Sequence, residues 1–221
     1  MTQRKAVHPL PVALVTGGSR GLGRAFTISL VRRGWHVVID GRDPVRLTEL
    51  VTRIENPHAV TAVPGDVRDS RHRLRLAAAA AEMGGLDLLV NNASVLGPSP
   101  QPQLADYPLE VLEQVYAANT LAPLALFQAL LPQLARSAKA ALDQLTAVLA
   151  VEHANLRVYA FDPGDMATDL HQQAFPGEDI SDRPAPERVV PALLALAEGD
   201  LPSGRYRAAD LLVETAGDNS R

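Results

Sequence analysis

Short apolar runs alternate with amphipathic stretches along most of the chain. The apolar runs have the length and the side chains of β-strands, and they fall at residues 12–15, 36–40, 59–63, 86–90 and 156–161. The stretches between them have apolar residues at helical spacing, which predicts helices at 23–33, 44–54, 70–83, 109–135, 137–153 and 186–198. Strands that alternate with helices are joined in parallel, so we expect a doubly wound α/β sheet in three layers.

The segments outside this alternation predict loops and tails. Residues 163–185 are rich in proline, glycine and acidic residues and follow a predicted strand. Loops at the carboxyl ends of strands bind ligands in such folds, so this segment is a candidate substrate lid. We interpret residues 1–221 as a single domain, with loose tails at about 1–11 and 214–221.

Composition narrows the classes of function. The chain has 221 residues, is 47% hydrophobic and carries a formal net charge of −4. This charge does not favour nucleic acid or an anionic membrane as a partner, and the sequence contains no apolar segment typical of a secretion signal or a membrane span. We therefore expect a cytoplasmic protein. The six histidines are scattered and cysteine is absent, so no metal site is predicted.

A glycine-rich turn gives the most specific chemical signal. Thr16, Gly17, Gly21 and Gly23 form the pattern T-G-x-x-x-G-x-G between the first predicted strand and the first predicted helix. Glycines allow the backbone to turn tightly and to approach a pyrophosphate, and the start of the helix presents free N–H groups to that anion. The turn therefore predicts a dinucleotide site on a Rossmann-like sheet.

The spacing of this motif resembles the short-chain dehydrogenase/reductase family, and further segments agree with it in order along nearly the whole chain. They are Asp66-Val67 after the third strand, Asn91-Asn92-Ala93-Ser94 after the fourth, Asn119 in the next helix, and Pro163-Gly164 with Thr168. The resemblance implies a set of cofactor-binding residues: Gly17, Ser19, Arg20, Gly21, Leu22, Gly23, Arg42, Asp66, Val67, Asn91, Ala93, Lys139, Pro163, Gly164 and Thr168.

The choice between the two nicotinamide cofactors depends on charge at the end of the second strand. An acid there binds a free 2′-hydroxyl, whereas a 2′-phosphate needs a cation. In the family pattern the acid would fall at Gly41, with Arg42 directly after it, and Arg20 lies in the glycine turn. Two guanidinium groups can share a phosphate, so NADP(H) is favoured over NAD(H). Two alternatives stay open: a register shift would make Asp40 a ribose ligand, and Arg42 could pair with Asp43.

The proton-transfer residues are incomplete. The resemblance implies a tyrosine, a lysine four residues after it that also holds the nicotinamide ribose, and a serine at the end of the preceding strand. Lys139 matches the lysine and Asn119 matches a relay asparagine, but the tyrosine position is Ala135. The strand and the serine that should precede the lysine are also not found. Lys139 therefore either binds ribose or is an ordinary exposed helix residue.

Loss of a central strand should change the path of the chain, because each strand returns it across the sheet. Either residues 121–153 form one long helix that Pro132 kinks, or the 137–153 helix swings away and the 156–161 strand moves beside 86–90. Both outcomes expose apolar surface. We therefore expect lower stability than in an intact relative, or a homo-oligomer.

The resemblance implies oxidation of an alcohol or reduction of a carbonyl in a small-molecule substrate. Because Asn119 and Lys139 alone remain of the family's catalytic set, activity is expected to be weak or absent. The alternatives are a non-catalytic NADP(H)-binding or dimerisation module and a degenerate product with no function of its own.

Overall fold

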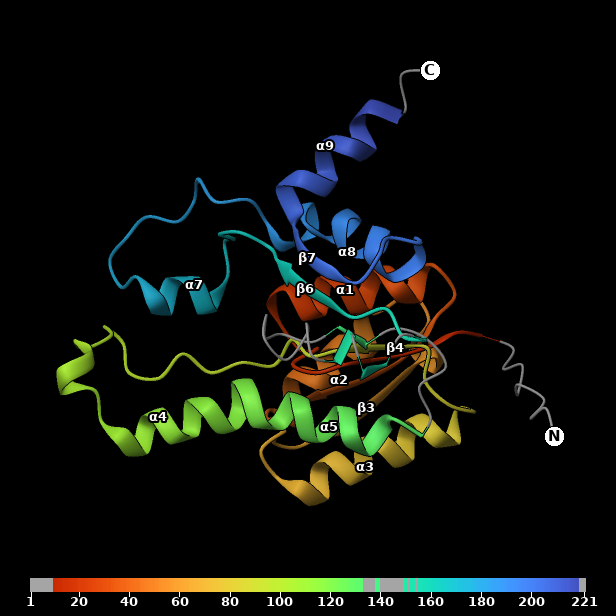
Figure 1. Ribbon diagram of the computed structural model, residues 1–221, viewed down its shortest axis with the longest axis horizontal. Coiled ribbons are helices and arrows are strands. Elements are labelled where there is room, and N and C mark those ends of the chain that lie inside the picture. The colour runs from red at the N-terminus through yellow and green to blue at the C-terminus, as the bar shows by residue number, and fades with distance from the viewer. Residues whose placement is uncertain (1–9, 133–137, 140–148, 151, 154, 219–221) are drawn as a thin grey trace.

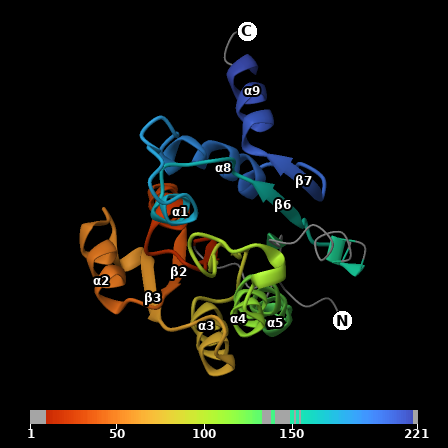
Figure 2. The same cartoon turned by 90° about the vertical axis from the view of Figure 1, so that its left-hand side faces the viewer.

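The computed structural model describes residues 10–132, 138–139, 149–150, 152–153 and 155–218. Within them a parallel sheet has the strand order β3-β2-β1-β4-β5-β6-β7 (Figures 1 and 2). The strands are β1 (Val12–Val15), β2 (His36–Gly41), β3 (Val60–Pro64), β4 (Leu88–Val90), β5 (Ala138–Lys139), β6 (Tyr159–Asp162) and β7 (Gly204–Arg207). The predicted doubly wound α/β fold is confirmed.

Helices cover both faces of the sheet and make three layers (Figure 1). One face carries α1 (Gly21–Arg32), α2 (Pro44–Arg53) and α8 (Val190–Glu198), and the other carries α3 (Ser70–Glu82) and α5 (Ala122–Leu130). Strand residues alternate between the two cores, with Val15 and Val37 toward α1 and α8, and Leu14 and Val38 toward α3 and α5. Burial on both faces explains why the strands read as continuous apolar runs.

The first half of the chain follows the sequence pattern closely. Each predicted strand from 12–15 to 86–90 is present within two residues of its expected ends, and α1, α2 and α3 lie within two residues of the predicted helices. Asp43 and Asp69 begin α2 and α3 as N-caps, with side chains that accept hydrogen bonds from backbone N–H groups of the first turn. Local signals are sufficient here because capping and periodicity agree.

The expected gap in the centre of the sheet is wrong. Ala138–Lys139 form β5, with Ala138 beside Leu89, and Lys139 between Val90 and Tyr159. A vacancy between β4 and β6 would leave backbone N–H and C=O groups of both strands without partners, and two residues are enough to bridge part of it. The central strand is therefore present, and Ala138 and Lys139 are its described residues.

Three further expectations about the path of the chain fail. The long helix from 121 to 153 does not form, because α5 ends at Leu130, just before Pro132. The predicted 137–153 helix is wrong at residues 138–139; residues 149–150 are helical, and 140–148 lie outside the described residues. The strand at 156–161 does not move beside β4, since β5 separates them.

The predicted helix at 109–135 is interrupted. It consists of α4 (Leu109–Tyr116), a π-helical turn at Ala117–Leu121, and α5. Turns of this kind occur often at functional sites, because they alter which side chains face inward. Asn119 lies at the centre of the turn.

The carboxyl-terminal part contains more structure than the sequence suggested. The candidate lid at 163–185 includes the short helix α7 (Asp169–Ala174). The expectation of a loose tail from 214 is wrong as far as residue 218, because α9 (Ala208–Asp218) follows β7 directly and rises from the body in Figure 1. Residues 1–9 of the other predicted tail are outside the described part of the chain. Across the residues described, no helix combines the length and the apolar character needed to cross a membrane.

Candidate cofactor-binding site

The glycine turn joins β1 to α1 and is fixed by backbone contacts. Gly17 and Gly21 both have positive φ angles, 65° and 52°, which side-chain-bearing residues rarely adopt. Gly23 serves a different purpose: a Cβ there would lie 2.5 Å from the Asn92 Nδ2 atom and 2.6 Å from the Gly17 carbonyl oxygen. The first two glycines shape the turn, and the third lets α1 pack closely against it.

Thr16 and Asn92 tie this turn to the end of β4. The Thr16 hydroxyl accepts backbone hydrogen bonds from Asn92 and Ala93, each at 3.0 Å. In return, the Asn92 amide donates to the carbonyl oxygens of Thr16 and Gly17 at 2.8 and 3.2 Å. The residues after β4 are therefore held against the glycine turn.

A buried carboxylate holds the turn from the other side. Asp40, at the end of β2, is 1% exposed, and its Oδ1 accepts the Gly17 N–H at 2.7 Å. Its Oδ2 lies 3.0 Å from Nε2 of His72, a fully buried residue of α3. The Arg75 guanidinium lies 3.2 Å from His72 Nδ1. Since an arginine only donates, Nδ1 accepts, and Nε2 carries the proton that it donates to Asp40.

These contacts enclose a cavity of about 490 Å³ at the carboxyl edge of the sheet. Eleven of the residues predicted to bind cofactor line it: Gly17, Ser19, Arg20, Gly21, Leu22, Arg42, Asp66, Val67, Ala93, Pro163 and Thr168. Gly23, Asn91 and Gly164 are not part of the lining that the structure describes. The cavity therefore brings together segments that are far apart in the sequence.

One end of the cavity is rich in arginine. Arg20, Arg42 and Arg46 all line it, and Arg42 and Arg20 are exposed. Asp43 does not pair with Arg42 in the described structure: its Oδ1 caps α2, and its Oδ2 lies 3.4 Å from Arg46 Nε. The alternative of an Arg42–Asp43 surface pair is thus not supported by the geometry.

Asp66 lies at the same end and is held by its neighbour. Arg68 donates to both of its carboxylate oxygens, with an Nη2–Oδ2 distance of 2.6 Å. This hydrogen bonding lowers the pKa of Asp66, and the charge of Arg42 adds a smaller effect in the same direction. Asp66 therefore keeps its negative charge, and with it an acceptor toward the cavity, into more acidic solution than an ordinary aspartate.

The other end of the cavity is formed by the residues after β4 and β6. Ser94, Val95 and Ala118 line it together with Pro163 and Met166. Thr168 caps α7, with its hydroxyl accepting the His171 N–H at 3.2 Å. Among the residues that line this end, Ser94 carries an exposed hydroxyl, where the family pattern has glycine.

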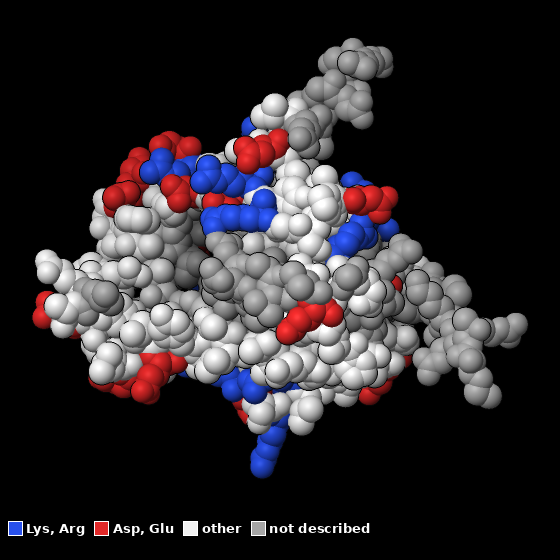
Figure 3. All heavy atoms as spheres, viewed as in Figure 1, with Lys and Arg blue, Asp and Glu red and all other residues white. Residues whose placement is uncertain are grey.

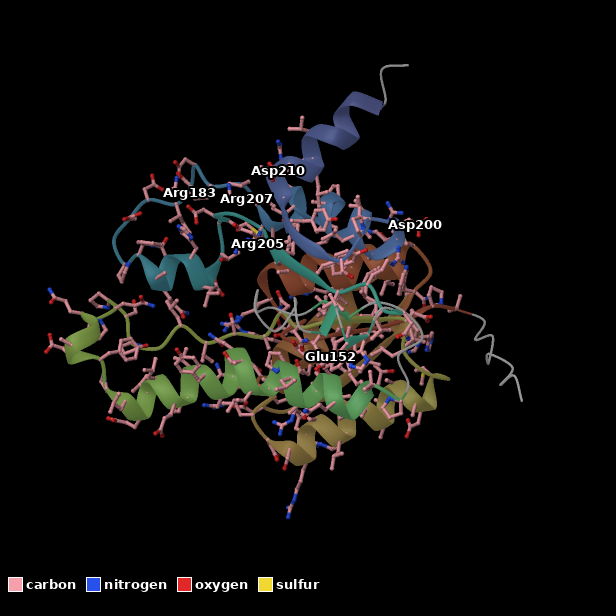
Figure 4. The ribbon with its side chains drawn as sticks, viewed as in Figure 1. Glu152, Arg183, Asp200, Arg205, Arg207 and Asp210 are labelled. Atoms are coloured by element: carbon pink, nitrogen blue, oxygen red, sulfur yellow. The ribbon has the colours of Figure 1, made fainter. Side chains whose placement is uncertain are left out.

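A charged cluster supports the turn that leads to this end. Asp162 accepts the Gly164 N–H at 3.0 Å, and Gly164 has a φ of 72°. Arg205 and Arg207, on alternate positions of β7, lie 3.7 and 3.8 Å from Asp162 Oδ2. Figure 4 shows both arginines close to the start of α9, and Figure 3 shows acidic and basic side chains mixed on this part of the surface. Gly164 thus positions the turn rather than lining the cavity.

Asn119 fixes the loop after β4. Its Oδ1 accepts the Val95 N–H and its Nδ2 donates to the Val95 carbonyl oxygen, both at 2.9 Å. Both polar groups of the side chain are therefore used to shape the cavity wall, and a catalytic role for this residue stays a prediction.

Lys139 does not lie on a helix as expected. The structure places its backbone at the end of β5, beside Val90, on the edge of the sheet where the cavity opens. Its side chain lies outside the described atoms, as do Ala135 and Ser137. The residue therefore reaches the correct edge of the fold, but by a different element.

All four tyrosines of the chain are described, and none lines the cavity. Tyr159 is buried and donates to the Leu201 carbonyl oxygen, while Tyr206 donates to that of Pro202. Burial raises the pKa of Tyr159, which further separates it from proton-transfer chemistry. Tyr107 and Tyr116 belong to the segment around α4.

Comparison with known proteins agrees with this geometry. The sequence model of the family described as short chain dehydrogenase matches residues 11–138. The chain belongs to the short chain dehydrogenase family. The matched segment runs from β1 to the first residue of β5, and so includes the glycine turn, Asp66 and Asn119.

Two curated relatives in this family are similar over most of the chain. A rhamnolipids biosynthesis 3-oxoacyl-[acyl-carrier-protein] reductase of Pseudomonas aeruginosa is 35% identical over 166 residues, which cover 73% of this chain and 63% of that protein. The chain thus spans less than two thirds of that relative. The short chain dehydrogenase penD of Penicillium thymicola is 30% identical over 208 residues, covering 77% of this chain and 75% of that protein.

A solved structure shows the same arrangement in three dimensions. A putative short chain dehydrogenase from Shigella flexneri, complexed with NADP, superposes with a TM-score of 0.83 at 26% identity. The match covers 93% of this chain and 100% of that chain. The overall architecture of the family is therefore retained.

Sequence reasoning missed several residues that shape the site. His72 was one of six scattered histidines, and Arg46 and Asp169 carried no motif. The burial of His72 follows from α3 packing, which a sequence does not display directly. Asn92 had a visible signal, because it stands inside the Asn91–Ser94 motif.

His72→Leu removes the ring N–H from the buried Asp40 carboxylate at little change in volume. We expect the free energy of unfolding to fall by about 2 kcal/mol, the scale of one hydrogen bond to a charged group. His72→Gln, which can restore a donor, should recover part of this loss, and Arg71→Ala on the exposed side of α3 should change it by less than about 0.5 kcal/mol. Urea denaturation measures all three; equal losses for His72→Leu and His72→Gln would contradict the assignment.

Arg68→Gln removes the cation that depresses the pKa of Asp66. Because the folded-state pKa of Asp66 is lowered, its stabilisation is present above the unfolded value of about 3.9 and is lost as pH falls through the folded value. The variant should therefore titrate closer to that ordinary value. A carboxyl-detected NMR titration checks this, and an unchanged Asp66 pKa would show that the Arg68 contact has no such effect.

Proposed function

We propose that this chain binds NADP(H) and acts as an oxidoreductase on an alcohol/carbonyl pair, with impaired proton transfer. The cavity supports the dinucleotide part of the proposal. Its wall contains the glycine turn, in which Gly17 and Gly21 supply backbone that approaches a pyrophosphate, and the amino-terminal end of α1 directly follows. The bound nicotinamide would supply or accept the hydride.

The preference for NADP(H) rests on the hydrogen bonds that the Asp40 carboxylate already makes within the protein. Asp40 lines the cavity, but its side chain is almost fully buried, and its two carboxylate oxygens already accept the Gly17 N–H and the His72 ring proton, which disfavours a further bond from a ribose 2′-hydroxyl. Asp43, the next acid, is occupied by the α2 cap and Arg46. Arg20 and Arg42 remain as cations at this end, which favours a 2′-phosphate. The NADP-bound relative from Shigella flexneri agrees with this choice.

The residues at the nicotinamide end support an impaired reaction. Pro163 and Thr168 would hold the nicotinamide, and Asn91 and Ala93 would follow the ribose path. The cavity offers the Ser94 hydroxyl but no phenol from the four described tyrosines. Lys139, from the end of β5, is the remaining candidate for a cation near the reacting oxygen. A carbonyl bound there would lack the acid that the family uses to protonate it.

A non-catalytic NADP(H)-binding or dimerisation module is the second candidate. The observation in its favour is the apolar surface of the central helices: Leu109, Tyr116 and Leu121 of α4 and the π-helical turn are 71%, 55% and 59% exposed. Apolar residues grouped on one element favour a partner, and a second copy of the chain would fit.

Arg42→Ala tests cofactor choice. If Arg42 contacts the 2′-phosphate, its loss should weaken NADPH binding roughly 10- to 100-fold, equivalent to about 1.5–3 kcal/mol, and leave NADH binding within about threefold. Arg53→Ala, at the far end of α2, is the matched control and should change neither affinity. Isothermal titration gives both constants. Equal weakening of NADPH and NADH, or tighter binding of NADH by the wild-type chain, would argue for NAD(H).

Turnover separates the enzyme from the binding module. Without a tyrosine acid, we expect NADPH oxidation with small aldehydes and ketones to be roughly 10²- to 10⁴-fold slower than in an intact reductase of the family. Lys139→Ala should abolish the remaining rate, and any loss of affinity should be equal for NADPH and NADH because the residue lies at the nicotinamide end. Rates equal to those of an intact reductase would overturn the claim of impairment, and no turnover with intact NADPH binding would favour the module.

A further inference from the structure

Arg46 faces two carboxylates at once. It projects from the first turn of α2, where its Nε lies 3.4 Å from Asp43 Oδ2, and its Nη1 lies 3.7 Å from Asp169 Oδ2. Asp43 is fixed by its role as the α2 cap, whereas Asp169 belongs to α7, in the candidate lid. The arginine therefore connects the adenosine end of the cavity to the segment that covers its other end.

The Arg46–Asp169 contact is one of the few polar contacts that the structure describes between α7 and the earlier part of the chain. In the part of the chain that the structure describes, a hydrogen bond from the Ser99 hydroxyl to the Gln173 carbonyl oxygen is the other polar contact between α7 and a segment before β6. Figure 1 shows α7 set apart from the sheet, on the side where α4 begins. A change at Arg46 would thus act on a segment with little else to hold it.

The Arg46–Asp169 ion pair is weak enough for another anion to replace Asp169. Arg46 and Asp169 side chains are 49% and 65% exposed, and exposed ion pairs of this kind are readily replaced by a better partner. A phosphate dianion placed between Arg20 and Arg42 is such a partner, because arginine forms paired charge-assisted hydrogen bonds to phosphate. All three arginines and Asp169 line the same cavity, so the phosphate and Asp169 would compete for one guanidinium.

We propose that Arg46 is a second specificity residue shared between Asp169 and the 2′-phosphate of NADP(H), so that recognition of this phosphate releases the α7 latch. The inference rests on the proposed NADP(H) function. NAD(H), which carries no 2′-phosphate, leaves Arg46 on Asp169. Coupling between two sites is reciprocal, so the same competition makes Asp169 an antagonist of NADP(H) binding.

The test is a double-mutant cycle on binding. Asp169→Asn should tighten NADPH binding about 2- to 5-fold, since it frees Arg46 for the 2′-phosphate. Arg46→Gln should weaken NADPH binding, and Asp169→Asn should then have no effect in the Arg46→Gln background. Glu178→Gln removes one charge from the same segment away from the cavity and should change nothing.

Two shorter probes isolate the phosphate. Adenosine 2′,5′-diphosphate and adenosine 5′-monophosphate differ in the 2′-phosphate and carry no nicotinamide that could touch α7. Asp169→Asn should tighten the first and leave the second unchanged, as measured by isothermal titration with circular dichroism to confirm folding. Equal effects on both probes, or no effect on either while the wild-type chain binds NADPH, would overturn the shared role of Arg46. Absence of saturable NADPH binding to the wild-type chain would overturn the proposed function and this inference together.

Discussion

The cofactor end of this protein depends on one buried carboxylate. Asp40 ends β2 beneath the glycine turn and joins three elements, because it accepts the Gly17 N–H and the His72 ring proton while its backbone oxygen accepts the Gly18 N–H at 3.0 Å. A charge with so little solvent must be fully hydrogen-bonded, so the positions of the turn and of α3 are mutually fixed. The His72 ring is packed closely against the backbone at Gly65, because a Cβ at that position would lie 2.3 Å from His72 Nδ1.

The same constraint affects cofactor choice. An acid at the end of the second strand is the feature that suits NAD(H), and Asp40 was the sequence alternative for that role if the register shifted by one residue. In our proposal, its burial beneath the turn excludes it from that role and leaves the arginines of the cavity wall to bind the phosphate. The buried Asp40 carboxylate thus stabilises the glycine turn, whereas the exposed Arg42, two residues later in the chain, is available to a ligand.

The catalytic end has no comparable support. Of β5 the structure describes two residues, and the described tyrosines make contacts in other parts of the fold. Binding and chemistry occupy different segments of such a sheet, so one can be retained while the other is weakened. In our account, the chain keeps the geometry for a dinucleotide and has lost much of the proton chemistry.

The sequence was sufficient wherever the signal was local. The strands of the first half and the glycine turn follow from nearby residues, and the motif after β4 contributes Asn92, Ala93 and Ser94 to the cavity wall. It failed where the answer depends on the whole sheet: residues 138–139 lie in a stretch whose pattern predicted a helix, yet they pair with β4 and β6 because those strands need a partner. The burial of Asp40 and His72 and the approach of Arg46 to Asp169 are likewise tertiary facts.

A crystal structure of the chain with NADP⁺ bound tests the central claim most directly. The account predicts that the 2′-phosphate lies between Arg20 and Arg42 while Asp40 keeps its hydrogen bonds to Gly17 and His72. An Asp40 carboxylate turned outward onto the adenosine ribose, with the arginines directed to solvent, would contradict it.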